Sequence, residues 1–188
     1  MSLRSLGATV CVLPLIIAAA VAATPVSVGA FKSVHLNGGG HVVLHHGAKQ
    51  QVTLLKGSTQ FTRFEIRDGD TLVIDVCTAD CPHNYQLEVD ITAPNIEGAA
   101  INGGGEIEAQ GTFPNQGHLN VAVSGGGEID VRSIPADAVN AAINGGGEIR
   151  TSPRRTLQAA VNGGGEITYT GNPNVTSAVM GGGDVTKK

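Results

Sequence analysis

Hydrophobic and polar residues alternate in short blocks along this chain, and the same block recurs. INGGGEIE at Ile101 is followed by VSGGGEID, INGGGEIR, VNGGGEIT and VMGGGDVT, and LNGGGHVV at Leu36 is an earlier variant. The last five glycine triplets start at residues 103, 125, 145, 163 and 181, at intervals of 22, 20, 18 and 18. A period near 20 is typical of solenoids, and glycine with β-branched residues disfavours helices. The pattern predicts an all-β fold, a parallel β-solenoid (β-helix) with about 18–22 residues per coil.

The alternation within each block predicts which side chains face the interior. Ile101 and Ile107 have odd numbers and would lie on one face of a strand, whereas Asn102 and Glu106 have even numbers and would lie on the other. We refer to this odd or even position as the parity of a residue. We therefore expect two inner ladders of stacked aliphatic side chains: Ile101, Val123, Ile143, Val161 and Val179, and Ile107, Ile129, Ile149, Ile167 and Val185.

The glycine triplets have two interpretations. Because the parity continues across each triplet, we expect a strand that runs through or bends gently, with glycine allowing close packing. The alternative is a true corner with a residue at positive φ. The repeat glycines are Gly103, Gly104, Gly105, Gly125, Gly126, Gly127, Gly145, Gly146, Gly147, Gly163, Gly164 and Gly165.

Residues 30–94 have a less regular pattern than the repeats at 95–188. Strand patterns start at Gln51, Phe61, Thr71 and Tyr85, and the segment RDGDT at Arg67 indicates a hairpin turn. We expect this N-terminal β region to start the solenoid and to close its end. Two lysines at the C-terminus are expected to blunt the opposite edge.

The first residues have the features of a secretory signal peptide. Residues 1–23 combine Arg4, an apolar run and small residues before the expected cleavage site. We expect residues 24–188 to form a single exported domain, periplasmic, secreted or on the cell surface, with no membrane span after cleavage. In that compartment, Cys77 and Cys81 predict a disulfide, and the alternative is a metal site with His83.

Composition and charge exclude several classes of partner. The net charge is −4, and there is no basic patch of the kind that nucleic acid requires. With no Trp, two Tyr and four Phe, the chain offers little aromatic surface for stacking on bases or sugars.

Outward polar ladders are the main candidates for chemistry. One is acidic: Glu106, Glu128, Glu148, Glu166 and Asp184. It could simply keep a flat β surface soluble, or it could bind Ca²⁺ weakly, because it supplies fewer than the six to eight oxygens that Ca²⁺ prefers. Docking of a partner on the acidic stripe is a further alternative. Beside it, Asn102, Asn144, Asn162 and Ser124 form a second ladder, for which we expect hydrogen bonds between stacked amides.

The histidines are a weaker candidate for a metal site, and the sequence shows no candidate catalytic site. His35, His41 and His45 share a parity, so a metal site there is a minor alternative to solvent-facing histidines. No nucleophile motif is present, and the carboxylates repeat in register rather than clustering as in polysaccharide-active enzymes. We therefore predict a protein that is not an enzyme and that has no catalytic residues and no cofactor beyond weak Ca²⁺.

The chain also resembles a known family. The segments GAFKSVHLNGGGHVVLHHG and LEVDITAPNIEGAAINGGGEIEAQG, with the repeated GGGEI units, are similar to the auto-transporter adhesin head GIN domain over roughly residues 31–185. The resemblance implies an exported, right-handed parallel β-solenoid of bacteria without catalytic residues. The triple glycine departs from the Gly-Ser-Gly common in the family.

Together these observations predict an adhesin-like or structural module of the cell envelope that presents a flat ladder surface. The expected partners are an envelope polysaccharide or a protein, and homo-oligomers could form through the edge coil or the flat face. A cation-binding solenoid is the alternative function, and a polysaccharide-active enzyme is disfavoured.

Overall fold

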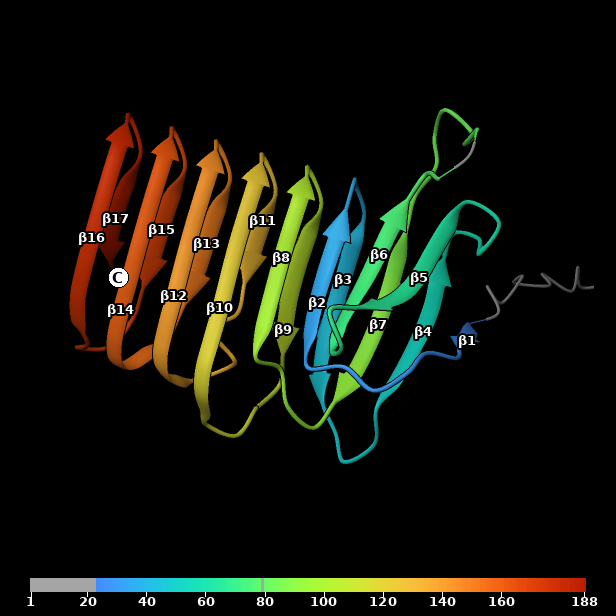
Figure 1. Cartoon of the computed structure of the whole chain (residues 1–188), viewed down its shortest axis with the longest axis horizontal. Helices are drawn as coiled ribbons and strands as arrows, with labels where there is room; N and C mark the ends of the chain where they lie inside the picture. Colours follow the sequence, from blue (N-terminus) through green and yellow to red (C-terminus); the bar gives the residue numbers. More distant parts are fainter. Residues whose placement is uncertain (1–22, 79) are drawn as a thin grey trace, which may run out of the picture.

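The computed structural model describes residues 23–78 and 80–188, in which every regular element is a β-strand (Figure 1). The predicted signal peptide lies outside the described residues, apart from its last position. Among the described residues there is no helix long and apolar enough to cross a membrane. The strands are β1 (Thr24–Val26), β2 (Ser33–Asn37), β3 (His41–His46), β4 (Gln51–Lys56), β5 (Thr62–Arg67), β6 (Thr71–Val76), β7 (Glu88–Ala93), β8 (Gly98–Gly103), β9 (Glu106–Gln110), β10 (Gln116–Gly125), β11 (Glu128–Asp130), β12 (Ala136–Gly145), β13 (Glu148–Thr151), β14 (Pro153–Gly163), β15 (Glu166–Tyr169), β16 (Asn174–Gly181) and β17 (Asp184–Lys187).

These strands form two mixed sheets. Sheet A has the order β1-β4-β7-β3-β9-β11-β13-β15-β17, and sheet B has the order β16-β14-β12-β10-β8-β2-β6-β5. Strands β1, β4 and β5 pair antiparallel with their neighbours, and the remaining pairs are parallel. The fold is therefore all-β and mostly parallel, which is consistent with the expected solenoid.

Each glycine triplet joins a strand of sheet B to the next strand in sheet A. We call such a pair of strands a rung; β8 with β9 and β10 with β11 are two examples. Successive rungs pair in register, so that Val123 lies beside Ile101 and Ile143, and Ile129 lies beside Ile107 and Ile149. Both predicted inner ladders are confirmed, and all but their last members, Val179 and Val185, are buried.

The triplets themselves are corners, so the prediction of a strand running through them was wrong. Strand β10 ends at Gly125 and β11 begins only at Glu128. Gly125 has φ 121°, a conformation that L-residues with a side chain rarely adopt. A Cβ on Gly127 would lie 2.7 Å from Cγ2 of Ile101, so this glycine faces the interior as its parity predicts. The corner preserves the parity, which is why alternation alone did not reveal it.

Strands β6 and β7 form a further rung, although the loop with the Cys77–Cys81 disulfide joins them instead of a glycine triplet. With this rung included, the order of the rungs in space differs from their order in the chain. The rung β2–β3 lies between β6–β7 on one side and β8–β9 on the other. The predicted hairpin is the antiparallel pair β5–β6, whose turn has φ 54° at Asp68 and 90° at Gly69. The N-terminal region therefore contributes complete rungs as well as the antiparallel strands at that end.

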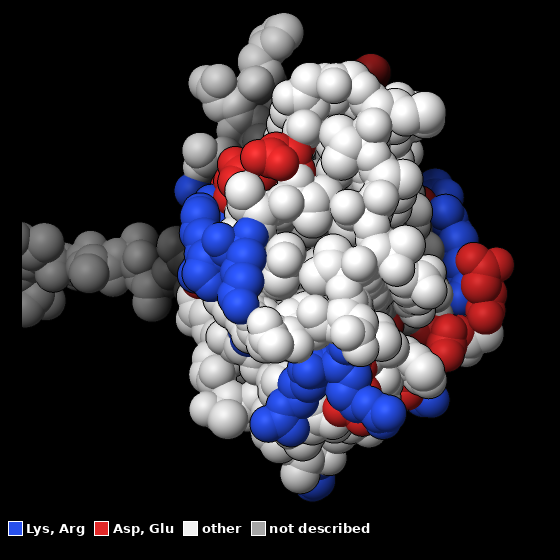
Figure 2. Space-filling view, turned by 90° about the vertical axis from the view of Figure 1, so that its left-hand side faces the viewer, with Lys and Arg blue, Asp and Glu red and all other residues white. Residues whose placement is uncertain are grey.

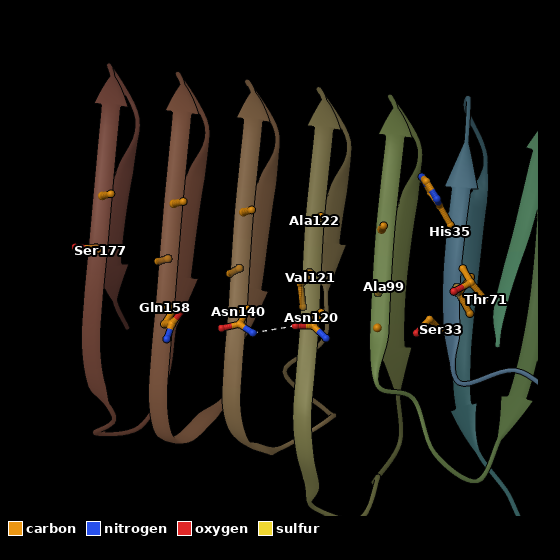
Figure 3. A pocket seen from close by; sticks show the side chains of 18 of the residues that line it. Ser33, His35, Thr71, Ala99, Asn120, Val121, Ala122, Asn140, Gln158 and Ser177 are labelled. Atoms are coloured by element: carbon orange, nitrogen blue, oxygen red, sulfur yellow. Dashed lines mark hydrogen bonds between the residues drawn. The ribbon is translucent and has the colours of Figure 1, made fainter. Parts of the chain in front are cut away.

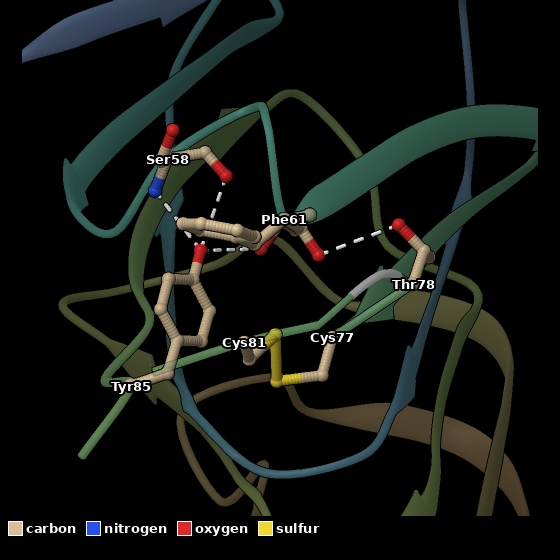
Figure 4. Close-up of a disulfide and its surroundings, with 7 residues drawn as sticks. Ser58, Phe61, Cys77, Thr78, Cys81 and Tyr85 are labelled. Carbon is tan, nitrogen blue, oxygen red and sulfur yellow. Dashed lines mark hydrogen bonds between the residues drawn. A yellow bond between two sulfur atoms is a disulfide. The ribbon is translucent and has the colours of Figure 1, made fainter. Parts of the chain in front are cut away.

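A loop with a disulfide connects β6 to β7 (Figure 4). Cys77 and Cys81 are bonded to each other, with their Cα atoms 5.6 Å apart. The Tyr85 hydroxyl lies 2.7 Å from the Thr62 hydroxyl and accepts a hydrogen bond from the Ser58 amide at 2.9 Å. These bonds fasten the segment before β7 to the loop that connects β4 and β5.

The C-terminal end has no comparable covering in the described residues. All eight residues of β16 are exposed, and the exposed fractions of Val179 and Met180 are 43% and 66%. Figure 2 looks onto this end and shows charged side chains mainly toward its margin. The last rung thus leaves part of the inner ladder in contact with solvent.

Candidate functional site

The outward faces of the two sheets have different chemistry. Sheet A presents carboxylates, histidines and an arginine, for example Glu106, His41 and Arg150. The middle of sheet B, between β2 and β16, presents alanine, serine, threonine and amide side chains, and the exposed Arg154 and Arg155 lie at the start of β14. Because the strands of both sheets are in register, each face consists of straight columns of equivalent residues.

A shallow trough of about 590 Å³ runs along sheet B (Figure 3). Its floor is a column of alanines in register: Ala100, Ala122, Ala142, Ala160 and Ala178. One side is a column of polar side chains, Asn120, Asn140, Gln158 and Thr176. His35 and Ser33 lie at the β2 end. The lining contains no Asp, Glu, Lys or Arg, so the trough suits an extended, uncharged ligand with hydrogen-bonding groups.

A hydrogen bond between two amide side chains of neighbouring rungs occurs in a different column from the expected one. Asn140 Nδ2 donates to Asn120 Oδ1 at 2.9 Å, on the side of the trough. Asn144 and Asn162 are adjacent in register, but no hydrogen bond joins their side chains. Elsewhere in this column, Asn37, which lies beside Asn102, donates from Nδ2 to Asp75 Oδ1 at 2.6 Å. The expectation of hydrogen bonds between the stacked amides themselves was wrong, since these exposed groups can instead be solvated by water.

The acidic residues singled out in the sequence form one column on sheet A. Glu106, Glu128, Glu148, Glu166 and Asp184 are consecutive neighbours in register. His41 continues the column on the other side of Glu106. Thr168 and Thr186 both donate to Glu166 Oε1, at 3.2 and 3.1 Å.

Arg150 provides the cation that sequence reasoning missed. Its guanidinium forms an ion pair with Glu128, and its Nε lies 2.7 Å from Glu148 Oε1. Burial would lower the pKa of Arg150, but the hydrogen bond to Glu128 and the charge of Glu148 raise it above its ordinary value. These two carboxylates are therefore already paired, which makes them poorer Ca²⁺ ligands. The signal was the arginine two residues after the ladder glutamate in INGGGEIR, where the other blocks have Glu, Asp, Thr or Val.

Asp130 stands beside Arg150 and is held by a second arginine. Arg132 donates from its backbone N at 3.2 Å and from Nε at 3.0 Å to Asp130 Oδ1. Burial alone would raise the pKa of Asp130, but these hydrogen bonds outweigh it and hold the pKa below its usual value. The ionised carboxylate therefore stabilises the folded protein.

We expect Asp130→Asn to lower the free energy of unfolding by roughly 1–2 kcal/mol at pH 7, because charge-assisted hydrogen bonds are lost. Because the pKa of Asp130 is lower in the folded state, its ionisation contributes to the free energy of unfolding at pH values above the unfolded-state pKa of about 3.8. This contribution is lost as the pH falls through the folded-state pKa. The difference between the two proteins should therefore shrink in acid. Urea unfolding between pH 7 and pH 3 measures it.

Asp137→Asn is the matched control, because the Asp137 carboxylate accepts a hydrogen bond from the Asn115 amide at 3.0 Å rather than from an arginine. Its effect should be within about 0.5 kcal/mol at every pH. A pH-independent loss in Asp130→Asn would contradict the assigned role of the ionised group.

The three histidines considered as a metal site do not come together. His35 is on β2 of sheet B, whereas His41 and His45 are on β3 of sheet A, so their side chains point from opposite faces. His45 Nε2 lies 3.0 Å from Asp90 Oδ2. His41 instead lies near Glu106 and Glu108, with ligand atoms within 4.8 Å of one another.

Several proteins of known crystal structure are similar to this chain. A "putative adhesin" from Bacteroides fragilis has a TM-score of 0.57 at 16% identity, covering 89% of this chain and 96% of its own. A "putative adhesin" from Parabacteroides merdae has a TM-score of 0.46 at 16% identity, covering 89% and 95%. A "putative lipid binding protein" from Parabacteroides distasonis has a TM-score of 0.45 at 14% identity, covering 89% and 96%. At these identities, the first of them shows a shared fold.

No curated protein matches the chain. A family model matches residues 30–116 and again residues 99–173, so the two matches together span most of the sequence. The overlapping matches fit a chain in which one structural unit recurs. The chain therefore belongs to the family described as "Putative auto-transporter adhesin, head GIN domain".

Proposed function

We propose that this protein is a right-handed parallel β-solenoid that works as an exported, adhesin-like module of the cell envelope and is not an enzyme. The registered stacking of rungs supports the solenoid, and the family description supports the adhesin-like role. In this proposal, the flat trough on sheet B binds an extended, neutral polysaccharide.

The observation that carries this proposal is the absence of charge along the trough. Ala122 and Ala142 provide a flat floor, and Asn120, Asn140 and Gln158 provide donors and acceptors on three successive rungs. A neutral glycan chain presents hydroxyl groups that such amides can bind without the cost of desolvating a charge. With few aromatic residues to stack on sugars, affinity would come from many weak contacts repeated along the rungs.

Binding to immobilised neutral and anionic envelope polysaccharides tests the proposal. The double variant Ala122→Arg with Ala142→Arg fills the floor and adds charge, and we expect it to weaken binding to neutral polysaccharide by about tenfold or more, equivalent to about 1.4 kcal/mol. Both positions are outward-facing and exposed, so the fold should persist, which thermal unfolding checks.

Gln110→Arg is the control, because Gln110 is exposed on the outward face of sheet A. It should bind neutral polysaccharide like the unmodified protein. The proposal is wrong if only anionic polysaccharides bind, if none binds, or if the control loses as much affinity as the trough variant.

A further inference from the structure

We propose that His41, Glu106 and Glu108 form a binding site for a divalent transition-metal ion such as Zn²⁺ on the outward face of sheet A. The site is on the opposite face from the proposed glycan trough and does not depend on it. Imidazole nitrogen and carboxylate oxygen are both established zinc ligands. Three protein ligands would leave one tetrahedral position for water.

The fold brings the three residues together although His41 is far from the glutamates in the chain. Strand β3 pairs with β9, which places His41 directly beside Glu106. Glu108 lies two residues further along β9 and therefore on the same face. The order of rungs in space is decisive here, because it places the only GGGH block beside the first GGGE block.

The distances are compatible with a shared ion after small side-chain movements. One ligand atom from each residue lies within 4.8 Å of the others, and His41 Nε2 lies 3.9 Å from Glu108 Oε2. Two ligands at about 2.0–2.2 Å from one Zn²⁺ are less than about 4.4 Å apart. The Glu108 side chain is 38% exposed, so it has the freedom to close the remaining gap.

The second observation is an unsatisfied nitrogen. The His41 side chain is 37% exposed, but its Nε2 atom is shielded from solvent and has no group within hydrogen-bond distance, which is uncommon for a buried polar atom. His45 lies four residues further along β3, on the same face. It differs from His41 because its Nε2 lies 3.0 Å from Asp90 Oδ2. A metal ion between His41 and the glutamates would satisfy the nitrogen.

The pattern of charge compensation on sheet A points to the same place. Glu88 forms an ion pair with Lys56 at 3.4 Å, and Arg150 forms ion pairs with Glu128 and Glu148. In the described part of the chain, no Lys or Arg forms an ion pair with Glu106 or Glu108. Glu108 accepts a hydrogen bond from Gln110 Nε2 at 3.0 Å. The hydrogen bond to Asp130 raises the pKa of Arg132, and Arg132 is near enough for the charge of Glu108 to raise it further, but it forms no ion pair with Glu108. Two neighbouring carboxylates that no Lys or Arg pairs with directly favour a bound cation.

The imidazole selects the class of ion. Ca²⁺ and Mg²⁺ prefer oxygen ligands alone, whereas imidazole suits Zn²⁺, Cu²⁺ and Ni²⁺. Histidine stands at the position that glutamate or aspartate occupies in the other blocks. This single replacement, between Glu88 and Glu106 in register, turns one position of an acidic column into a mixed nitrogen and oxygen site.

Calorimetric titration of the purified protein with ZnCl₂ tests the site, with Co²⁺ absorption as a second readout of the coordination. We expect one ion per chain, and we expect His41→Gln or Glu106→Gln to lower the affinity by about tenfold or more. His45→Gln, on the same strand and face, and Glu166→Gln, in the same acidic column, are the matched controls and should bind as the unmodified protein does. Thermal unfolding without metal shows whether each variant is folded.

Several results would overturn the proposal. They are the absence of Zn²⁺ binding, equal losses in Glu166→Gln and Glu106→Gln, or a loss in His45→Gln as large as that in His41→Gln. Competition of millimolar Ca²⁺ with Zn²⁺ at equal affinity would also contradict it, because it would indicate diffuse binding along the acidic column.

Discussion

Substituting Ala for the first or third glycine of a triplet should destabilise the protein, whereas the same change at the middle glycine should not. A Cβ on Gly127 would lie 2.7 Å from Cγ2 of Ile101 and 2.8 Å from the Gly105 carbonyl oxygen, so we expect a loss of about 1–3 kcal/mol from overpacking. Gly125 has φ 121°, and its Cβ would lie 2.5 Å from the Gly103 carbonyl oxygen. Its loss should be at least as large.

Gly126 is the control within the same corner. Nothing lies within 4 Å of a Cβ built there, and its φ is outside the left-handed range. Gly126→Ala should leave the free energy of unfolding unchanged or raise it by up to about 1 kcal/mol, because alanine restricts the unfolded chain. Urea unfolding of the three variants measures the differences. Equal losses at all three positions would show that the corner does not have the described geometry.

Shortening a valine of the inner ladder should have an effect that depends on its rung. Val161 and Val179 are neighbours in one column, but Val161 is 2% exposed and Val179 is 43% exposed. Val161→Ala removes two buried methyl groups and leaves a cavity, so we expect a loss of about 2–3 kcal/mol. Val179→Ala should lower the free energy of unfolding by less than about 0.5 kcal/mol.

The same pair of variants also tests whether the C-terminal end is open in solution. If Val179→Ala is as damaging as Val161→Ala, this end is covered, for example by a second copy of the chain. Measuring both variants over a range of protein concentrations separates the two cases, because the stability of an oligomer depends on concentration.

Periodicity was enough to predict much of the interior. The alternation around Ile101 and Ile107 identified both ladders because one strand face is buried and successive side chains point to opposite faces. The column beginning at Glu106 follows from the same argument, since residues equivalent in the repeat are neighbours in a parallel sheet with this register.

Other features depend on contacts that a repeat does not encode. The alternation of inward and outward residues is the same whether a strand continues or turns a three-glycine corner. The turn at Gly103 therefore could not be recognised from the alternation alone. Nothing local to His41 indicates that its rung lies beside Glu106 rather than at the end of the stack. Arg150 is visible in the sequence, but its pairing with Glu128 and Glu148 follows from where the side chain lies across two rungs.

The position of β2–β3 inside the stack has a consequence for how the chain acquires its structure. This rung is made first but has neighbours from later segments on both sides, β6–β7 and β8–β9. Residues up to Ala93 must therefore associate before β2–β3 gains its first neighbours, and residues up to Gln110 before it has neighbours on both sides. Each later rung then adds to a finished template through contacts about 20 residues apart, the kind of local assembly that proceeds rapidly. Folding would then consist of one slow nucleation step, followed by stepwise growth toward the C-terminus.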